Sequence, residues 1–512
     1  MLPRRAAVRH IAMPIFLLLR REMYVRDEAN NAPVLPVAIV GAALRFPGGR
    51  DPASYQEMTS IGRQLFRELA RTAVDHDQAR VKGTGPLFSL DGVPLRAALL
   101  SDGTGESRNA ALAADSVTGR HVLAARIAAA ALTDVPDAGG VALSRTAAII
   151  AGSPEASMQV TGRWVRDSMG LSGIGAKPAS GQDQGPGDGP DRGGPHASCS
   201  LAAVAAGCEV LNTGELDLVL AGGVSTGIDH DWLSRRGRAG KLATKDVRIY
   251  DASPTGTLPG EGCGVVALMR AADARAAGLP IYAQIAGWHV ATGTEPDPTA
   301  LWPAYLRAGI DPADVQFVEG HGAATAAEDL AELSALAEVL GSRATGARGR
   351  CALGAVTANL GDARSAAGIA GLLKTALAMT AGTIPATTGC VRPHRLLQAL
   401  SSPFRLPQTP EPWPETSVQI AAVNSLGVDG LAGVPRSGPV HIVLRREPGA
   451  GRRAGRRRRN ASVVQALGPF AVPAPRAAVA TIRRAGAHAA PPRPRLPVDS
   501  DSDSGSPATR PS

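Results

Sequence analysis

The sequence predicts a layered α/β protein in which Ala-rich helices pack closely on buried strands. Its 512 residues are 44% hydrophobic and 19% charged, which provides a large core and more than one domain-sized unit. Only 3% of the residues are aromatic, so helices must contact strands mainly through small side chains. Short apolar runs that alternate with Ala-rich segments complete the pattern of a layered α/β fold.

In the first half of the chain, continuous apolar runs predict strands that are covered on both faces. We expect these strands at Leu35–Val40, at Thr146–Ile150, in the run that ends at Gly222-Gly223, and at Val265–Met269. Helical spacing predicts helices over Tyr55–Val74 and Arg120–Leu132. Loops are expected over Ala43–Gly49, His230–Lys245 and the Gly/Pro-rich residues 170–195.

The stretch from Gly193 to Gly223 carries the clearest chemical signal. It predicts a tight Gly-Pro turn that holds Cys199, then an Ala-rich helix, then the buried strand. Backbone N–H groups and the dipole at a helix N-terminus favour a thiolate. This arrangement is therefore typical of an enzyme with a cysteine nucleophile.

The second half repeats the alternation of strands and helices. Strands are expected at Ile281–Ile285, Val315–Glu319, Ala352–Val356 and Ile420–Val423, with Gly438–Arg446 as a closing edge strand and a helix over Ala366–Met379. Polar groups follow two of these strands, from Glu319 to Thr325 and from Val356 to Asp362. We therefore predict two related halves that face one cleft.

The net charge of +9 comes entirely from the C-terminal tail. Residues 448–512 hold twelve Arg, no Lys and three Asp, so 12 − 3 gives +9 and the other residues sum to zero. The tail is Ala/Pro-rich with almost no aromatic residue, which favours a disordered segment over a nucleic-acid binding site.

The location of the protein is inferred from its cysteines and its N-terminal run. Five widely spaced cysteines without a metal-binding spacing indicate a reducing, cytoplasmic setting and no metal site. The apolar run Ile11–Leu19 contains Pro14 and lacks a cleavage site, so we expect neither secretion nor a membrane anchor. Met23 is an alternative first residue.

Six segments, in this order, resemble the β-ketoacyl synthases, the ketosynthases of polyketide and fatty-acid assembly. They are VAIVGAALRFPGG from Val37, SLAAVAAGCEVLNTGELDLVLAGGV from Ser200, RIYDASPTGTLPGEGCGVVALMR from Arg248, VEGHGAATAAEDLAEL from Val318, ANLGDARSAAGIAGLLK from Ala358 and VNSLGVDG from Val423. The resemblance implies a thiolase-like, layered αβαβα fold of two related halves. It implies a leader over residues 1–35, an N-terminal half over 36–275, a C-terminal half over 276–447 and a tail over 448–512.

In this family a cysteine takes an acyl group from a carrier protein, and two histidines promote decarboxylation of a malonyl unit. The resemblance assigns the first histidine to His321, with Thr325, Asp329 and Asn359 as supporting residues. The second histidine is replaced by Asp362, and the family's nearby lysine by Thr357. An ionised carboxylate cannot donate a hydrogen bond to a developing enolate, so carbon–carbon bond formation is expected to be impaired or lost.

The position of the nucleophile has two interpretations. Counting back without gaps from Gly222-Gly223 places the family's cysteine at Ala197, two residues before Cys199. Matching the turn alone makes Cys199 the nucleophile and requires a two-residue deletion just after it. Two helical residues correspond to a rotation of about 200°, so the first helical turn must absorb that deletion.

Two functions follow from the resemblance. The first is acyl transfer from a carrier-protein thioester to Cys199, with no cofactor beyond the phosphopantetheine that the carrier protein brings. The alternative is a non-catalytic partner, similar to a chain-length factor, of an intact ketosynthase. The expected partners are an acyl carrier protein and either that ketosynthase or a second copy. The family's aromatic gating loop is replaced at Gly427–Ala432, and the family's dimer strand falls within residues 170–195, so gating and dimerisation are both in question.

Overall fold

A computed structural model describes most of the chain between residues 33 and 447. The described ranges are 33–68, 74–75, 96–100, 117–136, 145–151, 199–291, 300–341, 350–413, 418–426 and 438–447. They belong to the first of two compact units, Met1–Val464, whereas Gln465–Ser512 forms the second. The predictions for residues 1–32, 170–195, Ala197, Gly427–Ala432 and 448–512 lie outside the described residues.

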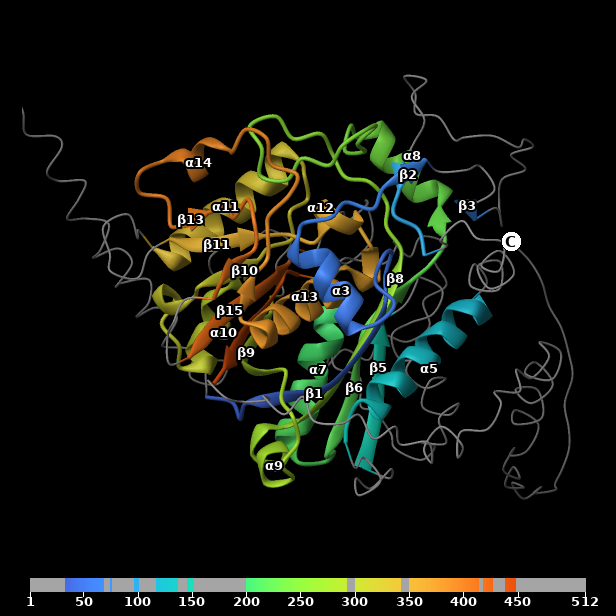
Figure 1. The fold of residues 1–512 in the computed structure, drawn as a ribbon, viewed down its shortest axis with the longest axis vertical. Coiled ribbons are helices and arrows are strands. Elements are labelled where there is room, and N and C mark those ends of the chain that lie inside the picture. Colours follow the sequence, from blue (N-terminus) through green and yellow to red (C-terminus); the bar gives the residue numbers. More distant parts are fainter. Residues whose placement is uncertain are drawn as a thin grey trace, which may run out of the picture. The chain divides into compact units, whose positions relative to one another are not determined.

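One mixed ten-stranded sheet forms the framework of the first unit (Figure 1). The strand order is β13-β11-β10-β15-β16-β9-β1-β8-β6-β5. The bounds of these strands are β1 Val37–Arg45, β5 Thr146–Ala151, β6 Leu218–Ser225, β8 Gly262–Arg270, β9 Ala283–Val290, β10 Phe317–Glu319, β11 Cys351–Gly354, β13 Phe404–Arg405, β15 Gln419–Ser425 and β16 Val440–Arg446.

Shorter strands pair outside this sheet. They are β2 Arg67–Glu68 with β4 Arg96–Ala97, β3 Val74–Asp75 with β7 Ile228–Asp229, and β12 Thr383–Ile384 with β14 Glu411–Pro412. The helices are α3 Pro52–Ser60, α5 Val117–Thr133, α7 Cys199–Thr213, α8 His230–Arg238, α9 Ala271–Ala276, α10 Trp302–Ala308, α11 Ala326–Leu340, α12 Thr357–Leu360, α13 Ala367–Ala381 and α14 Arg395–Gln398. Two 3₁₀ turns, η5 Pro312–Asp314 and η6 Arg364–Ala366, complete the described elements.

The sheet consists of two halves with matching strand pairings. In one half β5 and β6 are parallel, and β6–β8 and β8–β1 are antiparallel. In the other, β10 and β15 are parallel, and β15–β16 and β16–β9 are antiparallel. Antiparallel pairing of β1 with β9 joins the halves. We call them the N-half and the C-half.

Helices α7 and α13 form the middle layer, between the two halves of the sheet (Figure 1). Both contact strands from both halves and also contact each other. Helix α5 covers the outer face of the N-half, where it packs on β1, β6 and β8, and α10 packs on β9 and β16 of the C-half. The predicted layered α/β fold is confirmed.

Small residues allow the close helix-to-strand contacts that the composition predicts. A Cβ at Gly41 of β1 would lie 2.4 Å from the carbonyl oxygen of Ala131 on α5. Glycine is therefore required here by a close approach of the helix, and the strand does not end at this residue. The predicted loop over Ala43–Gly49 is wrong in its first part, because β1 continues past an irregular pairing at Ile39/Gly41 to Arg45.

One helix prediction and one loop prediction are corrected by the structure. The predicted helix Tyr55–Val74 ends early, because α3 stops at Ser60 and Gly62 adopts a left-handed φ of 69°. The predicted loop His230–Lys245 begins with helix α8. Its side chains Leu233 and Arg236, spaced i and i+3, are buried, and this tertiary burial outweighs the polar composition.

The last strand is also in a different place from the prediction. Gly438–Arg446 was expected to be a closing edge strand, but β16 lies between β15 and β9 and pairs with both. Val440, Ile442 and Leu444 are fully buried in the central core. An apolar strand gains more from two neighbours than from one, so chain order did not predict its place in the sheet.

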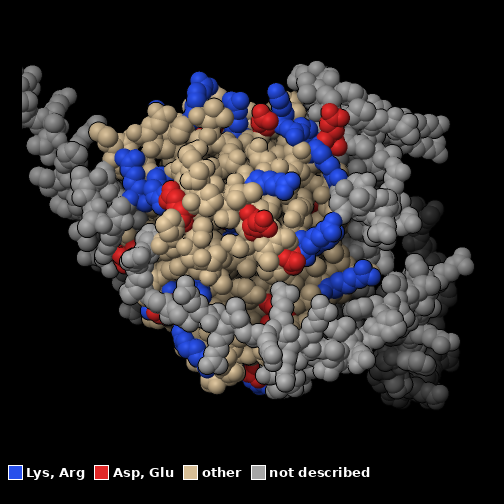
Figure 2. Space-filling model, viewed as in Figure 1, with Lys and Arg blue, Asp and Glu red and all other residues tan. Residues whose placement is uncertain are grey.

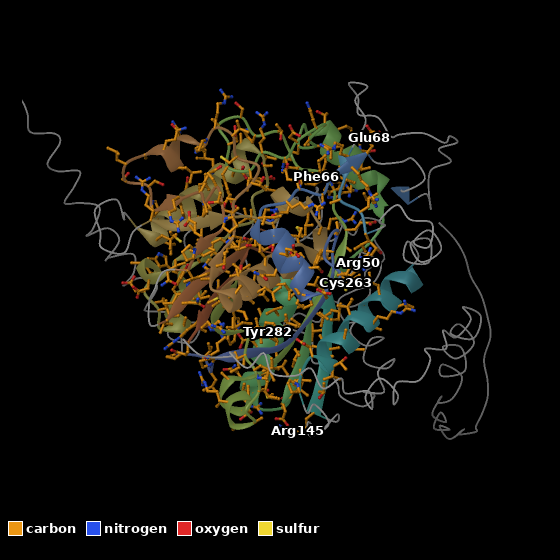
Figure 3. All side chains as sticks on the ribbon, viewed as in Figure 1. Arg50, Phe66, Glu68, Arg145, Cys263 and Tyr282 are labelled. Atoms are coloured by element: carbon orange, nitrogen blue, oxygen red, sulfur yellow. The ribbon has the colours of Figure 1, made fainter. Side chains whose placement is uncertain are left out.

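Acidic and basic side chains are interspersed on the described surface shown in Figure 2, without a continuous basic stripe. Figure 3 shows Arg145 at the lower end of the N-half, where β5 begins. Its guanidinium pairs with Asp217 and bonds the carbonyl of Gly214 at 2.7 Å, which ties the turn before β6 to β5. Within the described ranges no helix is both long and apolar enough to span a bilayer.

Candidate active site

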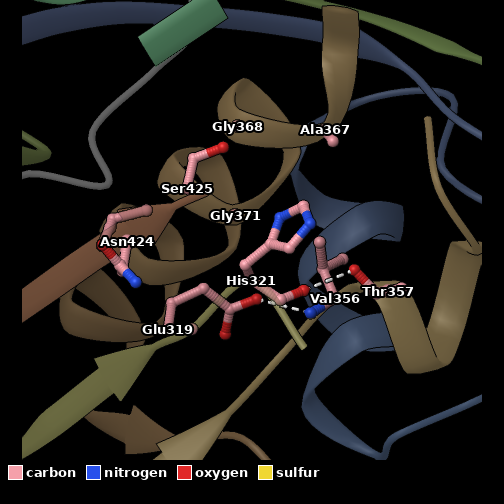
Figure 4. A pocket seen from close by; sticks show the side chains of 11 residues that line it. Glu319, His321, Val356, Thr357, Ala367, Gly368, Gly371, Asn424 and Ser425 are labelled. Carbon is pink, nitrogen blue, oxygen red and sulfur yellow. Dashed lines mark hydrogen bonds between the residues drawn. The ribbon is translucent and has the colours of Figure 1, made fainter. Parts of the chain in front are cut away.

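A small pocket surrounds His321 in the C-half (Figure 4). Strand β10 ends at Glu319, and the two residues that follow, Gly320 and His321, enter the pocket wall. The remaining lining residues come from Val356 at the N-cap of α12, from α12, from α13 and from the end of β15. Figure 4 shows the imidazole pointing away from Glu319 and toward the start of α13. Only about 10 Å³ of the pocket can hold the centre of a water molecule, which is space for about one water.

The carboxylate of Glu332 on α11 holds the loop that carries His321. Its Oε1 accepts hydrogen bonds from the backbone N–H of His321 and from Nδ2 of Asn424, both at 2.7 Å. Its Oε2 accepts from the N–H of Gly322 at 3.0 Å and from the hydroxyl of Tyr250 at 2.9 Å. A fully buried carboxylate with four donors is well compensated, and it orders the loop around His321.

One helical turn earlier, Asp329 holds two residues with left-handed backbone. Tyr250 has a φ of 51° and Ala324 a φ of 58°. Their N–H groups donate to Asp329 at 2.7 and 3.0 Å. Such conformations cost about 1–3 kcal/mol each unless the surroundings impose them. Burial raises the pKa of Asp329 well above its usual value, against the opposing effect of the Tyr250 N–H.

Beneath the pocket lies a buried ion pair between β10 and α13. The Nζ of Lys374 is 2.7 Å from Oε2 of Glu319, and both side chains are 1% exposed. Oε1 of Glu319 accepts the N–H of Val356 at 2.6 Å. Burial raises the pKa of Glu319, and the ammonium of Lys374 opposes that rise. The pair ties the floor of the pocket to the middle layer of helices.

Helix α12 brings Thr357 to the histidine. The hydroxyl of Thr357 donates to the carbonyl of His321 at 2.7 Å, and both residues line the pocket. Asn359, two residues later, points elsewhere and donates to the carbonyl of Arg63 at 3.0 Å. Thr357 therefore holds the backbone of the histidine, whereas Asn359 fixes α12 to the segment after α3.

Asp362 lies outside the lining of the His321 pocket and is engaged by arginine. Its Oδ2 is 3.3 Å from Nη2 of Arg236 on α8, and its Oδ1 accepts the N–H of Arg364 at 2.8 Å. Arg364 has a φ of 50° and donates to the Ser225 hydroxyl at 2.8 Å and to the Gly227 carbonyl at 2.6 Å. The carboxylate is thus held against the N-half.

Helix α7 begins at Cys199, beside the wall of the pocket. The next residue, Ser200, is fully buried, and its hydroxyl accepts the N–H of Ile369 in the first turn of α13 at 3.0 Å. A Cβ on Gly368, which lines the pocket, would lie 3.2 Å from that hydroxyl oxygen. The start of α7 and the His321 pocket are therefore adjacent.

The cysteines whose side chains are described are poor nucleophiles. Burial raises the pKa of Cys208 and Cys263, and it raises that of Cys390 to about 12. Cys351 is fully buried within β11. A thiol needs a lowered pKa and access to react, so none of these four fits the role.

The remaining candidate, Thr325, is the residue before α11, and its hydroxyl donates to Glu328 at 2.6 Å. It does not line the His321 pocket.

Three residues that hold the site were missed in the sequence: Glu332, Lys374 and Arg236. Glu332 could have been found, because it follows Asp329 by three residues on an Ala-rich helix and so shares its face. Lys374 and Arg236 depend on partners 55 and 126 residues away in the chain, respectively.

Comparison with known families identifies both halves. Residues 196–274 match the β-ketoacyl synthase N-terminal domain, and residues 282–390 match the β-ketoacyl synthase C-terminal domain. The chain therefore belongs to the β-ketoacyl synthase family. It contains a ketosynthase-like domain of the polyketide or fatty-acid synthase type.

Curated relatives are large synthases. The chain is 34% identical over 265 residues to the phthioceranic/hydroxyphthioceranic acid synthase of Mycobacterium tuberculosis, which is 49% of this chain and 12% of that protein. It is 33% identical over 261 residues to the highly reducing polyketide synthase sor1 of Hypocrea jecorina, which is 48% of this chain and 10% of that protein. The match thus spans about an eighth or less of these relatives.

Solved ketosynthases share the fold. The ketosynthase from module 6 of the bacillaene synthase of Bacillus subtilis 168 has a TM-score of 0.62 and 22% identity, over 80% of this chain and 72% of that one. An oxazolomycin ketosynthase domain of Streptomyces albus has a TM-score of 0.62 and 21% identity, and the match covers 80% of this chain and 74% of that one. These neighbours confirm the predicted thiolase-like α/β fold of the chain.

Proposed function

We propose that this ketosynthase-like domain transfers an acyl group from an acyl-carrier-protein thioester to Cys199, and that its carbon–carbon condensing activity is impaired or lost. One observation carries the proposal: the start of α7 at Cys199–Ser200 adjoins the pocket that holds His321, through the Ser200–Ile369 hydrogen bond. The four cysteines with described side chains fit the role poorly, and this also supports Cys199.

In the proposed step, the Cys199 sulfur attacks the thioester carbonyl carbon and a new C–S bond forms. The bond between that carbon and the carrier's phosphopantetheine sulfur breaks. The proton of the Cys199 thiol passes to His321 and then to the leaving thiolate, so charge and atoms balance. The backbone N–H groups at the start of α7 are suited to stabilise the developing oxyanion.

The impairment of condensation rests on Asp362 and Thr357. Both carboxylate oxygens of Asp362 are already engaged, because Oδ1 accepts the N–H of Arg364 and Oδ2 pairs with Arg236. The Thr357 hydroxyl is already used by the His321 carbonyl. Neither side chain therefore replaces the positive or proton-donating group expected at these positions.

The other expectations remain part of this proposal. They are Asp329, Thr325 and Asn359 as supporting residues, the acyl carrier protein and a second copy or an intact ketosynthase as partners, and a cytoplasmic location. The phosphopantetheine arrives on the carrier protein, so the proposed transfer uses no cofactor of its own.

Mass spectrometry of the full chain after incubation with an acyl-carrier-protein thioester tests the proposal. We expect an acyl adduct on the peptide that contains Cys199, loss of that adduct in Cys199→Ser and its retention in Cys390→Ser. His321→Ala should slow loading at least about tenfold, the lower end of the range for general acid–base catalysis. With a malonyl carrier protein as co-substrate, no condensed product should form.

An unmodified Cys199 under conditions that load a competent ketosynthase would overturn the acyl-transfer proposal. That result would instead support the alternative of a non-catalytic, chain-length-factor-like partner. Formation of a condensed product by the unchanged chain would overturn the proposed impairment.

A further inference from the structure

A second pocket lies near α12 and is separate from the His321 pocket. It is formed by the segment Ile61–Gln64 after α3, by Asp246–Arg248 and by Ala386–Val391. About 420 Å³ of it is open to water, and it shares no lining residue with the His321 pocket. Its wall is well ordered by hydrogen bonds from Gln64 to the Ala358 carbonyl at 3.0 Å and from the Leu65 N–H to the Asn359 carbonyl at 3.1 Å. This volume is within the range of small-molecule sites.

Arg248 lines this pocket and carries a buried hydrogen-bond donor that has no acceptor within the described residues. Its Nε is buried and has no hydrogen-bond partner in the part of the chain that the structure describes. A buried donor without an acceptor costs about 1–3 kcal/mol, and more when the group is charged. A guanidinium binds carboxylates and phosphates with paired N–H groups, so an anion is the acceptor that suits it best.

The nearby carboxylates are already engaged by other groups. Asp251 accepts the N–H groups of Val391, Arg392 and Ser253 at 2.7–2.8 Å. Burial would raise the pKa of Asp251, but these hydrogen bonds and the positive charge of Arg248 hold it below its usual value. Asp246 lies 3.8 Å from the guanidinium of Arg96. The charge of Arg248 acts on Asp251, but no hydrogen bond joins the Nε of Arg248 to either carboxylate in the described ranges.

The pocket lining is mainly polar, but it includes two exposed apolar side chains. Ile61 is 59% exposed and Val391 is 69% exposed, and they stand on two of the three segments that form the pocket. Cys390 also lines it, and burial raises the pKa of its thiol to about 12, so it stays neutral near pH 7 and does not repel an anion. A ligand with an apolar part would bury both exposed side chains, which is favourable at about 25 cal/mol per Å².

We infer that this second pocket binds a small organic anion that carries a short apolar chain. The anionic head group lies against Arg248, and the chain covers Ile61 and Val391. A carboxylate and a phosphate ester share this chemistry. The inference does not depend on acyl transfer at Cys199, because the two pockets have separate linings.

Calorimetric titration of the full chain tests this inference with hexanoate and hexyl phosphate as probes. We expect at least one of them to bind, and to bind at least tenfold more tightly than hexylamine, which has the same chain and the opposite charge. Inorganic phosphate, which lacks the chain, should bind more weakly than hexyl phosphate. The preference between hexanoate and hexyl phosphate shows whether the natural ligand carries a carboxylate or a phosphate ester.

Two variants and one control make the test specific. Arg248→Gln should weaken binding at least tenfold, and Val391→Glu should do the same through the rim while leaving Arg248 in place. Arg395→Gln, an exposed arginine on α14 outside the pocket lining, should bind as the unchanged chain does. Absence of binding by both anionic probes, or equal binding by the unchanged chain and both pocket variants, would overturn the inference.

Discussion

The N-half and the C-half share their strand pairings but fill equivalent positions differently. Matching β5–β6 with β10–β15 makes Ala151 the counterpart of Glu319, because these residues pair with Gly223 and Val423. Helices α7 and α13 have equal lengths, and their eighth residues, Ala206 and Lys374, are also counterparts. The C-half therefore has a buried ion pair where the N-half has two alanines.

Small residues in the N-half receive a segment from the C-half. A Cβ on Gly223 would lie 2.4 Å from the carbonyl oxygen of Ser365, and the Ser365 hydroxyl donates to the Val224 carbonyl at 2.8 Å. The same segment holds Asp362 and Arg364 against α8 and the end of β6. The C-half therefore provides the buried charged residues near the His321 loop, whereas the N-half provides space for the segment after α12.

Removing the charge of Lys374 should give the largest effect on stability. Lys374→Met leaves Glu319 buried without its cation, and breaking a buried pair in this way costs about 3–5 kcal/mol. The free energy of unfolding from urea titration measures the loss. The double variant Glu319→Leu/Lys374→Met restores an apolar interior like that of the N-half and should recover most of the stability. If the single and double variants were equally unstable, the ion pair would not account for the difference between the halves.

Filling the space at Gly223 should have the next largest effect. Gly223→Ala places a methyl group against the backbone of Ser365, and overpacking of this kind costs about 1–3 kcal/mol. Gly237→Ala on α8 is the matched control, because nothing lies within 4 Å of its Cβ position and alanine favours a helix by up to about 1 kcal/mol. Denaturant unfolding of both variants should show opposite signs. A neutral Gly223→Ala would contradict the proposed need for space.

A smaller, pH-dependent effect should come from β16. In the C-half, His441 on β16 pairs with Asn424 on β15. In the N-half, Cys263 on β8 pairs with Val224 on β6, so the buried residues His441 and Cys263 are counterparts. Burial lowers the pKa of His441 to about 3, and His289 on the neighbouring strand adds to this. The unfolded chain therefore binds a proton below about pH 6.5 that the folded chain does not, and stability falls as the pH drops from there toward 3.

The variant His441→Cys, which introduces the residue type of the N-half counterpart Cys263, isolates the contribution of His441 to the pH dependence. The unchanged chain should lose about 1–2 kcal/mol more stability between pH 6.5 and pH 5 than His441→Cys does, as measured by unfolding at each pH. His394→Gln, which changes a more exposed histidine, should keep most of the pH dependence. Equal pH dependence in the unchanged chain and His441→Cys would show that His441 titrates normally in the folded protein.

Local patterns in the sequence predicted much of the fold. Continuous apolar runs located β5, β8, β9, β10, β11 and β15 to within a few residues, and Ala-rich spacing located α5 and α13. The motif after β10 also placed His321 at a strand-to-loop junction. These predictions succeed because strand and helix periodicity are properties of neighbouring residues.

Contacts between distant segments decided the rest. Chain order suggested an edge for β16, yet pairing on both sides placed it inside the sheet. The composition of α8 suggested a loop, yet burial of Leu233 and Arg236 made it a helix. At the candidate site, the Arg236–Asp362 and Ser200–Ile369 contacts join residues 126 and 169 positions apart. Such pairings depend on how complete surfaces pack together, and this is information that local periodicity does not carry.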